Sequence, residues 1–279
     1  MDMFAAWKRL RHRIKADLWR RRGSMPGAPG SNAAKWLAVE RGIRAAHQGN
    51  YGRTDAGIDE RVVEYAWIFD RLKDLDSSAG PVLDAGSVMN HRVVIGLWNE
   101  VRRPPLSIVT QRYEGRAFVS NTVRYEFADL RRLPYRDDWF SIVLCVSTLE
   151  HVGLDNRIYG ADVESADPDK EALLAMRELL RVTAKGGTLL LSVPFGARAN
   201  RGWLRVFDGE ELQEIVQRSG WQLVRSRYFR ARQDGWRECA GAEAHDAGYN
   251  EPSERTGQRT APTFVVAAEA VALVELKKL

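Results

Sequence analysis

Residues 123–152 read VRYEFADLRRLPYRDDWFSIVLCVSTLEHV and contain two junctions between an apolar run and a polar loop. The first run, 123–127, leads to Asp129, and the second, 141–146, leads to Glu150 and His151. Both runs have the length of a strand and are rich in β-branched and aromatic residues, a composition that favours extended structure. The stretch therefore predicts two strands of a sheet, each followed by a loop that carries an acid.

The same pattern continues on both sides of this stretch. Upstream, PVLDAGS at 81–87 is a short apolar strand closed by an acid and a glycine, and downstream KGGTLLLSVP at 185–194 is a turn that leads into an apolar strand. The strands expected at 81–85, 106–110, 123–127, 141–146 and 188–193 are interspersed with helices expected at 90–101, 169–183 and 208–219. Because parallel neighbours need a crossover connection, this order predicts an α/β fold with a doubly wound, mostly parallel sheet.

Length and composition favour one main domain with an N-terminal extension. The chain has 279 residues, 44% of them hydrophobic, which suffices for one core. We expect a basic amphipathic helix at 1–22, a Gly- and Pro-rich linker at 23–32 and the domain at 33–279. Its leading helices are expected at 33–48 and 58–75, and two strands, 221–229 and 263–276, close it.

Cysteine usage and hydropathy predict the setting of the protein. Cys145 and Cys239 fit no metal-binding spacing, so we expect a reduced, cytoplasmic protein without a metal site. No apolar run approaches the roughly 18 residues of a membrane span, and no signal-peptide pattern is present. The sequence thus predicts a chain that neither spans a membrane nor is exported.

The N-terminal 22 residues carry nearly all of the net charge. They contain eight Lys or Arg residues against two Asp residues, a net charge of +6. Because the whole chain has a formal charge of +5, the remaining residues are about neutral, at −1, and offer no basic groove for nucleic acid. Apolar residues in this segment recur at helical spacing, at Phe4, Trp7, Leu10, Ile14 and Leu18. Such a helix either lies on an anionic membrane surface or packs on the domain or on a second subunit.

The strand-end segments resemble the class I S-adenosylmethionine-dependent methyltransferases. The string Leu149-Glu150-His151-Val152 is the most specific match, and Asp84-Ala85-Gly86-Ser87 resembles the family's first loop. The resemblance implies S-adenosylmethionine as cofactor, transfer of its methyl group to oxygen or nitrogen of a small acceptor, and a final strand inserted antiparallel beside the fifth. The run of residues 149–160, LEHVGLDNRIYG, is similar to one branch of this family. By analogy with that branch, a saccharide or a glycolipid is the favoured class of acceptor.

The resemblance also implies a cofactor loop after the first strand. Asp84 is expected to organise the loop or to hold the methionine amino group, and Ala85, Gly86 and Ser87 complete the contact. Gly86 can adopt a positive φ and let the backbone approach a ligand. The family's second and third glycine positions are Val88 and Asn90 here, and Asn90 is expected to cap a helix that begins at His91.

Further site residues follow from the other strand ends. The family's ribose-binding acid is missing after strand 106–110, where Gln111 or Glu114 is the candidate. Asp129 is expected to accept from the adenine amino group, the backbone amide of Leu130 to meet a ring nitrogen, and Ser147 to contact the cofactor. His151 is either a general base for the acceptor or a residue that supports the site. Beyond the fifth strand, Arg201 and Arg205 are either acceptor-binding groups or solvated loop charges.

Two other functions fit parts of the sequence. Val88 and Asn90 favour a methyltransferase fold that has lost its cofactor and serves as a binding module or scaffold, whereas Asp129 and the Glu150-His151 pair argue for an enzyme. A nicotinamide-dependent dehydrogenase is disfavoured because no G-x-G-x-x-G follows a strand.

Overall fold

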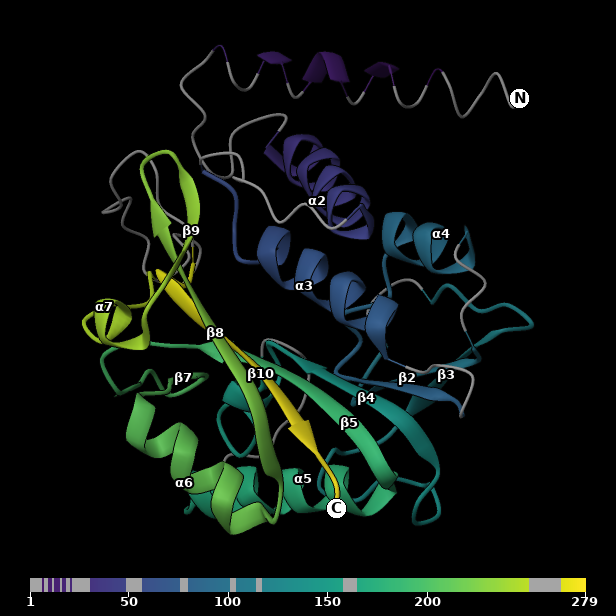
Figure 1. The fold of residues 1–279 in the computed structure, drawn as a ribbon, viewed down its shortest axis with the longest axis vertical. Coiled ribbons are helices and arrows are strands. Elements are labelled where there is room, and N and C mark those ends of the chain that lie inside the picture. Colours follow the sequence, from purple (N-terminus) through teal and green to yellow (C-terminus); the bar gives the residue numbers. More distant parts are fainter. Residues whose placement is uncertain are drawn as a thin grey trace.

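A computed structural model of the chain describes residues 31–48, 57–75, 80–100, 104–113, 117–157, 165–250 and 267–279, and single helical positions between 7 and 21. Its centre is an eight-stranded sheet with the order β3-β2-β1-β4-β5-β10-β8-β9 (Figure 1). The strands are β1 (Val82–Ala85), β2 (Leu106–Thr110), β3 (Val123–Phe127), β4 (Phe140–Val146), β5 (Thr183–Pro194), β8 (Gln222–Arg232), β9 (Gly235–Cys239) and β10 (Ala270–Lys277).

The strand directions confirm the predicted doubly wound, mostly parallel sheet. Strands β3, β2, β1, β4 and β5 pair in parallel, and β10 runs antiparallel between β5 and β8. The order turns back at β1 and β4, and in such sheets ligands bind beyond the carboxyl ends of the strands near that switch point. The fold therefore places the loops after β1 and β4 side by side.

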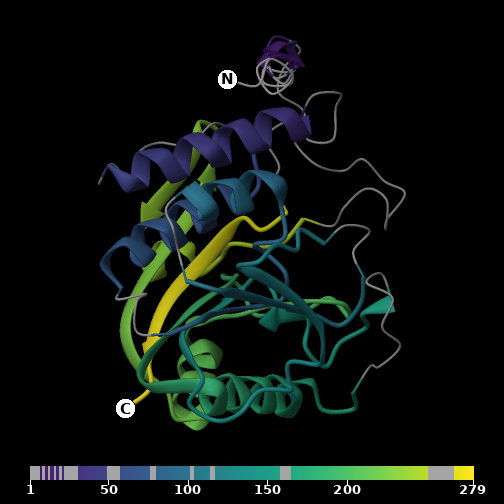
Figure 2. The ribbon, with the colours of Figure 1, turned by 90° about the vertical axis from the view of Figure 1, so that its right-hand side faces the viewer.

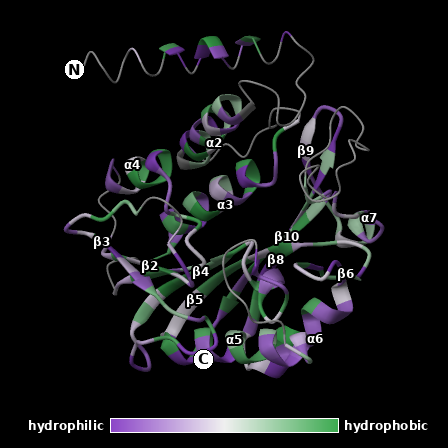
Figure 3. Cartoon of the chain, turned by 180° about the vertical axis from the view of Figure 1, so that it is seen from behind, coloured by the Kyte–Doolittle hydropathy of each residue, from purple (hydrophilic) through white to green (hydrophobic). Residues whose placement is uncertain are grey.

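Helices cover both faces of the sheet (Figures 1 and 2). On one face lie α2 (Ser31–His47), α3 (Arg61–Asp74) and α4 (Arg92–Glu100), whose core includes the buried Trp67 and Trp98. The other face carries α5 (Pro168–Val182) and α6 (Gly209–Ser219), with Met176 and Leu179 in a second core. The strands β4, β5 and β10 between these cores are largely hydrophobic (Figure 3), as expected for strands buried on both faces.

Local sequence signals set the ends of the main helices. Asp167 accepts a hydrogen bond from the backbone of Lys170 at 3.1 Å and caps α5, and Asp208 accepts from Glu211 at 2.8 Å and caps α6. Gly220 ends α6 in the left-handed conformation, with φ 88°. The predicted and observed boundaries of α5 and α6 therefore agree to within one residue.

Several elements differ from the sequence-based prediction. Helix α2 begins at Ser31, inside the predicted linker, and most of that linker lies outside the described residues. β5 starts at Thr183 and includes the glycine pair that was expected to form a turn. The prediction missed the edge strand β9, the short pair β6 (Ala199–Asn200) and β7 (Arg205–Val206), and the one-turn helix α7 (Gly241–Ala244). β10 begins at Ala270, and the first residues of its predicted range lie outside the described part of the chain.

The apolar stripe of the N-terminal segment is exposed where the structure describes it. Trp7, Leu10, Ile14 and Leu18 are 53%, 56%, 51% and 47% exposed, and Phe4 lies outside the described residues. Among the described residues, no helix combines the length and apolar character needed to cross a bilayer.

Candidate active site

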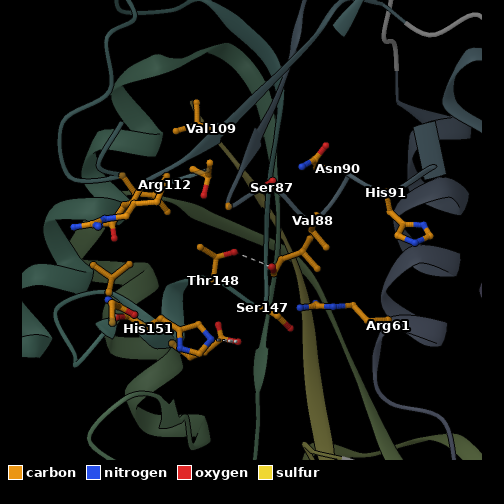
Figure 4. Close-up of a pocket in the computed structure, with 18 of the residues that line it drawn as sticks. Arg61, Ser87, Val88, Asn90, His91, Val109, Arg112, Ser147, Thr148 and His151 are labelled. Carbon is orange, nitrogen blue, oxygen red and sulfur yellow. Dashed lines mark hydrogen bonds and ion pairs between the residues drawn. The ribbon is translucent and has the colours of Figure 1, made fainter. Parts of the chain in front are cut away.

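A cavity of about 620 Å³ opens at the carboxyl ends of β1, β2 and β4 (Figure 4). Helices α2 and α3 contribute Lys35, Trp36, Arg61 and Tyr65 to its wall. In the close-up, His151 and Arg61 lie on opposite sides of Ser147 in the lower part of the view, and Val109 and Arg112 lie above them. Of the predicted site residues, the cavity is lined by Gly86, Ser87, Gln111, Asp129, Leu130, Ser147 and His151.

The loop after β1 is held by Asp84 rather than by a set of glycines. The two carboxylate oxygens of Asp84 accept hydrogen bonds from the backbone N–H groups of Val88 at 3.2 Å and Met89 at 2.7 Å. Asp84 and Ala85 are fully buried and are not among the described residues that line the cavity. Of the two roles expected for Asp84, its geometry fits the organisation of the loop, and the expected ligand contact of Ala85 is not supported.

Gly86, in the loop after β1, is packed against Thr148, which follows β4, at the cavity wall. Its φ is 129°, and an added Cβ would lie 2.0 Å from Thr148 Oγ1. Ser87 follows with φ 68° and Ser147 has φ 42°, conformations that non-glycine residues seldom adopt. Strained backbone of this kind clusters at functional sites, which agrees with the place of both residues at the cavity wall.

The start of α4 differs from the expected cap. The helix begins at Arg92, and His91 Nδ1 accepts a hydrogen bond from the backbone N–H of Val93 at 3.3 Å, so His91 caps it. Asn90 Oδ1 accepts from the backbone N–H of Phe118 at 3.1 Å and ties the loop to the segment before β3. The expectation that Asn90 caps a helix starting at His91 was therefore wrong, because a distant backbone donor binds its side chain.

The two candidate nucleoside contacts after β2 and β3 lie side by side. Gln111 Nε2 donates to Asp129 Oδ2 at 3.5 Å, and Arg131 binds both oxygens of the Asp129 carboxylate, at 2.9 and 2.5 Å. Partial burial alone would raise the pKa of Asp129, but the hydrogen bonds from Arg131 outweigh it and hold that pKa below its usual value. Asp129 is thus an ionised acceptor at the cavity wall, beside Leu130. Glu114, the other ribose candidate, lies outside the described residues.

His151 is held by the segment that follows β5. Its Nδ1 lies 2.9 Å from the carbonyl oxygen of Trp203, which can only accept, so Nδ1 carries the proton and Nε2 is the acceptor nitrogen of the neutral ring. The Nε2 atom lies 3.9 Å from Glu150 Oε1. The side chain is 17% exposed and lines the cavity, so its geometry suits a base.

The arginines expected on the acceptor side play different parts. Arg205 is 5% exposed and donates hydrogen bonds to Asp169 Oδ1 at 2.6 Å and to the carbonyl of Pro168 at 2.8 Å. These bonds stabilise the first turn of α5. Arg201 is exposed. Neither is among the described residues of the cavity wall, and the expectation that they bind the acceptor there is not supported.

A buried carboxyl group that the sequence analysis missed joins α3 to the sheet beside the cavity. Glu64 is fully buried, and its Oε1 accepts from the hydroxyls of Ser147 at 2.6 Å and Ser192 at 2.5 Å. Its Oε2 accepts from Arg61 at 2.6 Å. A signal was present in residues 62–69, VVEYAWIF, where a single acid interrupts an apolar run. An acid inside such a run is either paired or functional.

Two further carboxyl groups line the same end of the cavity. Burial, with the charges of Glu64 and Glu60, raises the pKa of Glu150 well above its usual range. Burial, followed by the charges of Asp59 and Glu64, raises the pKa of Glu60 to about 7. Carboxyl groups in a cleft whose pKa values are shifted by burial and by neighbouring charges are candidates for a functional site.

Comparisons with known proteins give one family match. Residues 99–191 match the family described as methyltransferase domain. No curated protein matches the chain significantly. Similar solved structures include the [4+2]-cyclase SpnF, with 18% identity over 91% of this chain and 98% of that one and a TM-score of 0.47.

Two other similar structures cover most of the domain. The YcgJ protein of Bacillus subtilis has 15% identity over 75% of this chain and 97% of its own, with a TM-score of 0.44. An S-adenosylmethionine-dependent methyltransferase from Mesorhizobium loti has 12% identity over 75% and 97%, with a TM-score of 0.45. Identities and TM-scores this low carry no argument about activity, so only the family match bears on what the chain does. The matched residues 99–191 run from the end of α4 into β5, and the sheet continues with an antiparallel β10 beside β5, so this part of the chain is similar to the methyltransferase domain family.

Proposed function

We propose that the protein transfers the methyl group of S-adenosylmethionine to an oxygen or nitrogen atom of a small acceptor, with a saccharide or glycolipid as the favoured class. The observation that carries the proposal is the cavity at the ends of β1, β2 and β4, where Gly86, Asp129 and His151 meet. The cofactor supplies an electrophilic methyl group on a sulfonium sulfur. Such a displacement needs alignment and exclusion of water more than covalent help from the protein.

The residues of the cavity fit this cofactor. Gly86 lets the loop after β1 pack directly against Thr148 at the cavity wall, and the ionised Asp129 is an acceptor suited to an exocyclic amine. Gln111, in contact with Asp129, is the side chain placed to reach ribose hydroxyls. At the opposite end, His151 presents its Nε2 as an acceptor for a proton that leaves a hydroxyl or an amine.

Asp129→Ala is expected to weaken the binding of S-adenosylmethionine and S-adenosylhomocysteine by about tenfold or more, from micromolar constants equivalent to about 8 kcal/mol. The variant removes a charged acceptor, while Arg131 keeps its ion pair with Glu171 at 2.6 Å, so the chain should remain folded. Titration calorimetry measures the loss. The matched control is Asp137→Asn, an exposed acid near the same segment. Equal affinities for Asp129→Ala and the wild type would remove Asp129 from the adenine site.

The N-terminal segment supports a second proposal, that residues 1–22 hold the enzyme on the cytoplasmic face of an anionic membrane. The segment has a charge of +6, and its described apolar side chains are about half exposed. Arg11 lies 5.0 Å from the ring centroid of Trp7, a pairing of basic and aromatic groups suited to the interface. Each basic side chain near such a surface contributes about 1 kcal/mol, and salt screens the attraction.

Truncation tests the membrane proposal. Full-length protein is expected to sediment with liposomes that contain phosphatidylserine, and a chain that starts at Ser31 is expected to stay in the supernatant. Neutral liposomes and high salt should each release the full-length protein, because both remove the electrostatic attraction. Equal sedimentation of the two chains would assign the segment to packing or dimerisation instead.

A further inference from the structure

Three buried oxygen atoms at the cavity wall accept no hydrogen bond from the residues that the structure describes. They are Glu60 Oε2, Glu150 Oε2 and Asn156 Oδ1. Glu150 and Asn156 are 2% and 8% exposed. Asn156 Nδ2 donates to the carbonyl of His151 at 2.8 Å, which assigns the other amide atom as the acceptor. Buried polar atoms are nearly always satisfied, so three acceptors around one cavity point to a ligand that donates.

The charges at this end of the cavity indicate a cation. Among the described residues, the guanidinium that acts on the carboxyl groups of Glu60 and Glu150 is that of Arg61, and it is paired with the carboxyl group of Glu64 at 2.6 Å. Of the other cations among the described residues of the wall, Lys35 is paired with Asp59 at 2.6 Å, and Arg112 lies in another part of the cavity (Figure 4). A cationic donor would relieve the repulsion between the carboxyl groups and complete their hydrogen bonds.

We propose that the acceptor carries a primary amino group, bound as an ammonium ion by Glu150, Glu60 and Asn156. An ammonium has three N–H donors and no acceptor, which matches three unpartnered acceptor oxygens. This inference rests on the methyl-transfer function proposed above and narrows its acceptor to an amine, for example that of an amino sugar.

The same carboxyl groups account for the proton that must leave. An ammonium nitrogen has no lone pair until one N–H bond breaks, the electron pair stays on nitrogen and the proton forms an O–H bond with the carboxylate of Glu150. Burial raises the pKa of Glu150, which brings its basicity closer to that of an amine. Glu150 thus binds the ammonium and prepares its nitrogen for methylation.

The inference predicts which small molecules bind. Calorimetry uses the full chain saturated with S-adenosylhomocysteine and two matched pairs of probes, 2-aminoethanol against ethylene glycol and D-glucosamine against D-glucose. We expect the amines to bind and their hydroxyl counterparts to give no response. A site that takes both members of a pair equally, or neither amine, overturns the inference.

Proton release gives a second readout. Below the pKa of Glu60, about 7, that carboxyl group is mainly protonated before the amine arrives, and a bound cation ionises it. Titrations near pH 6 in two buffers with different heats of ionisation should therefore show protons released on binding. Titratable and charged groups from three segments face these carboxyl groups. They are Lys35 from α2, Asp59, Arg61 and Glu64 from α3 and the residues before it, and His151 from the loop after β4.

Substitutions separate this site from the cofactor site. Glu150→Gln and, as the half-buried second variant, Glu60→Gln should each weaken amine binding about tenfold or more and reduce proton release. Their affinity for S-adenosylhomocysteine should stay within about twofold of the wild type. The exposed control Glu214→Gln should match the wild type in amine binding, proton release and affinity for S-adenosylhomocysteine. An equal loss of S-adenosylhomocysteine binding in these variants would assign the carboxyls to the cofactor and overturn the inference. If the wild type failed to bind S-adenosylhomocysteine at all, the proposed function itself would fail.

Discussion

Gly86→Ala is expected to reduce the affinity for S-adenosylhomocysteine by about 100-fold or more and to lower the melting temperature. The new Cβ would lie 2.0 Å from Thr148 Oγ1 and 2.6 Å from its Cγ2, and the residue has a φ of 129°. Thr148 cannot turn away freely, because its hydroxyl donates to the carbonyl of Val146 at 2.9 Å. The clash would separate the loops after β1 and β4, between which the cofactor is proposed to bind.

The control for this variant is Gly96→Ala in α4, where an added Cβ meets nothing within 4 Å. That change should raise stability by about 0.5–1 kcal/mol, since alanine favours a helix. In the double variant Gly86→Ala with Thr148→Gly, part of the lost affinity should return as space is restored. Wild-type affinity in Gly86→Ala would show that the ligand binds elsewhere.

If the methylated group is a hydroxyl, His151→Gln is expected to lower turnover by about 10² to 10⁴, the range of general-base assistance. The glutamine amide can keep a hydrogen bond to the Trp203 carbonyl, now 2.9 Å from Nδ1, but it cannot accept a proton as imidazole does. Affinity for S-adenosylhomocysteine should stay within a few-fold. Steady-state kinetics together with calorimetry separate the two effects.

His245→Gln is the matched control for His151, because His245 is exposed and its Nδ1 lies 2.7 Å from the Ala242 carbonyl oxygen in a similar local contact. It should behave as the wild type in both measurements. A lower melting temperature and weaker cofactor binding in His151→Gln, with unchanged turnover at saturation, would make His151 a supporting residue.

The sequence predicted the elements with strong local signals. Apolar runs such as 141–146 and helices capped by Asp167 or Asp208 were found because their pattern and caps are short-range. The edge strand β9 was missed because GWREC lies in a polar stretch and is extended only by pairing with β8. Tertiary context decides such a strand, and no local propensity shows it.

The site was predictable where it follows strand ends. Asp129 and His151 reach the cavity because parallel strands deliver their carboxyl ends to one edge. The buried Glu64 and its partner Ser192 are 128 positions apart, a pairing that needs the packed fold. The reason for the departures at Val88 and Asn90 also became clear only in three dimensions. Asp84 holds the loop through backbone N–H groups, which every residue except proline supplies.

Calorimetric titration of S-adenosylhomocysteine into the full chain, with NAD in parallel, tests the central claim most directly. The account predicts saturable binding with a micromolar dissociation constant, equivalent to about 8 kcal/mol, and a rise in melting temperature with ligand concentration. It predicts no response to NAD. Absence of binding would favour a fold that has lost its cofactor, and a response to NAD alone would contradict the assignment of the cavity to S-adenosylmethionine.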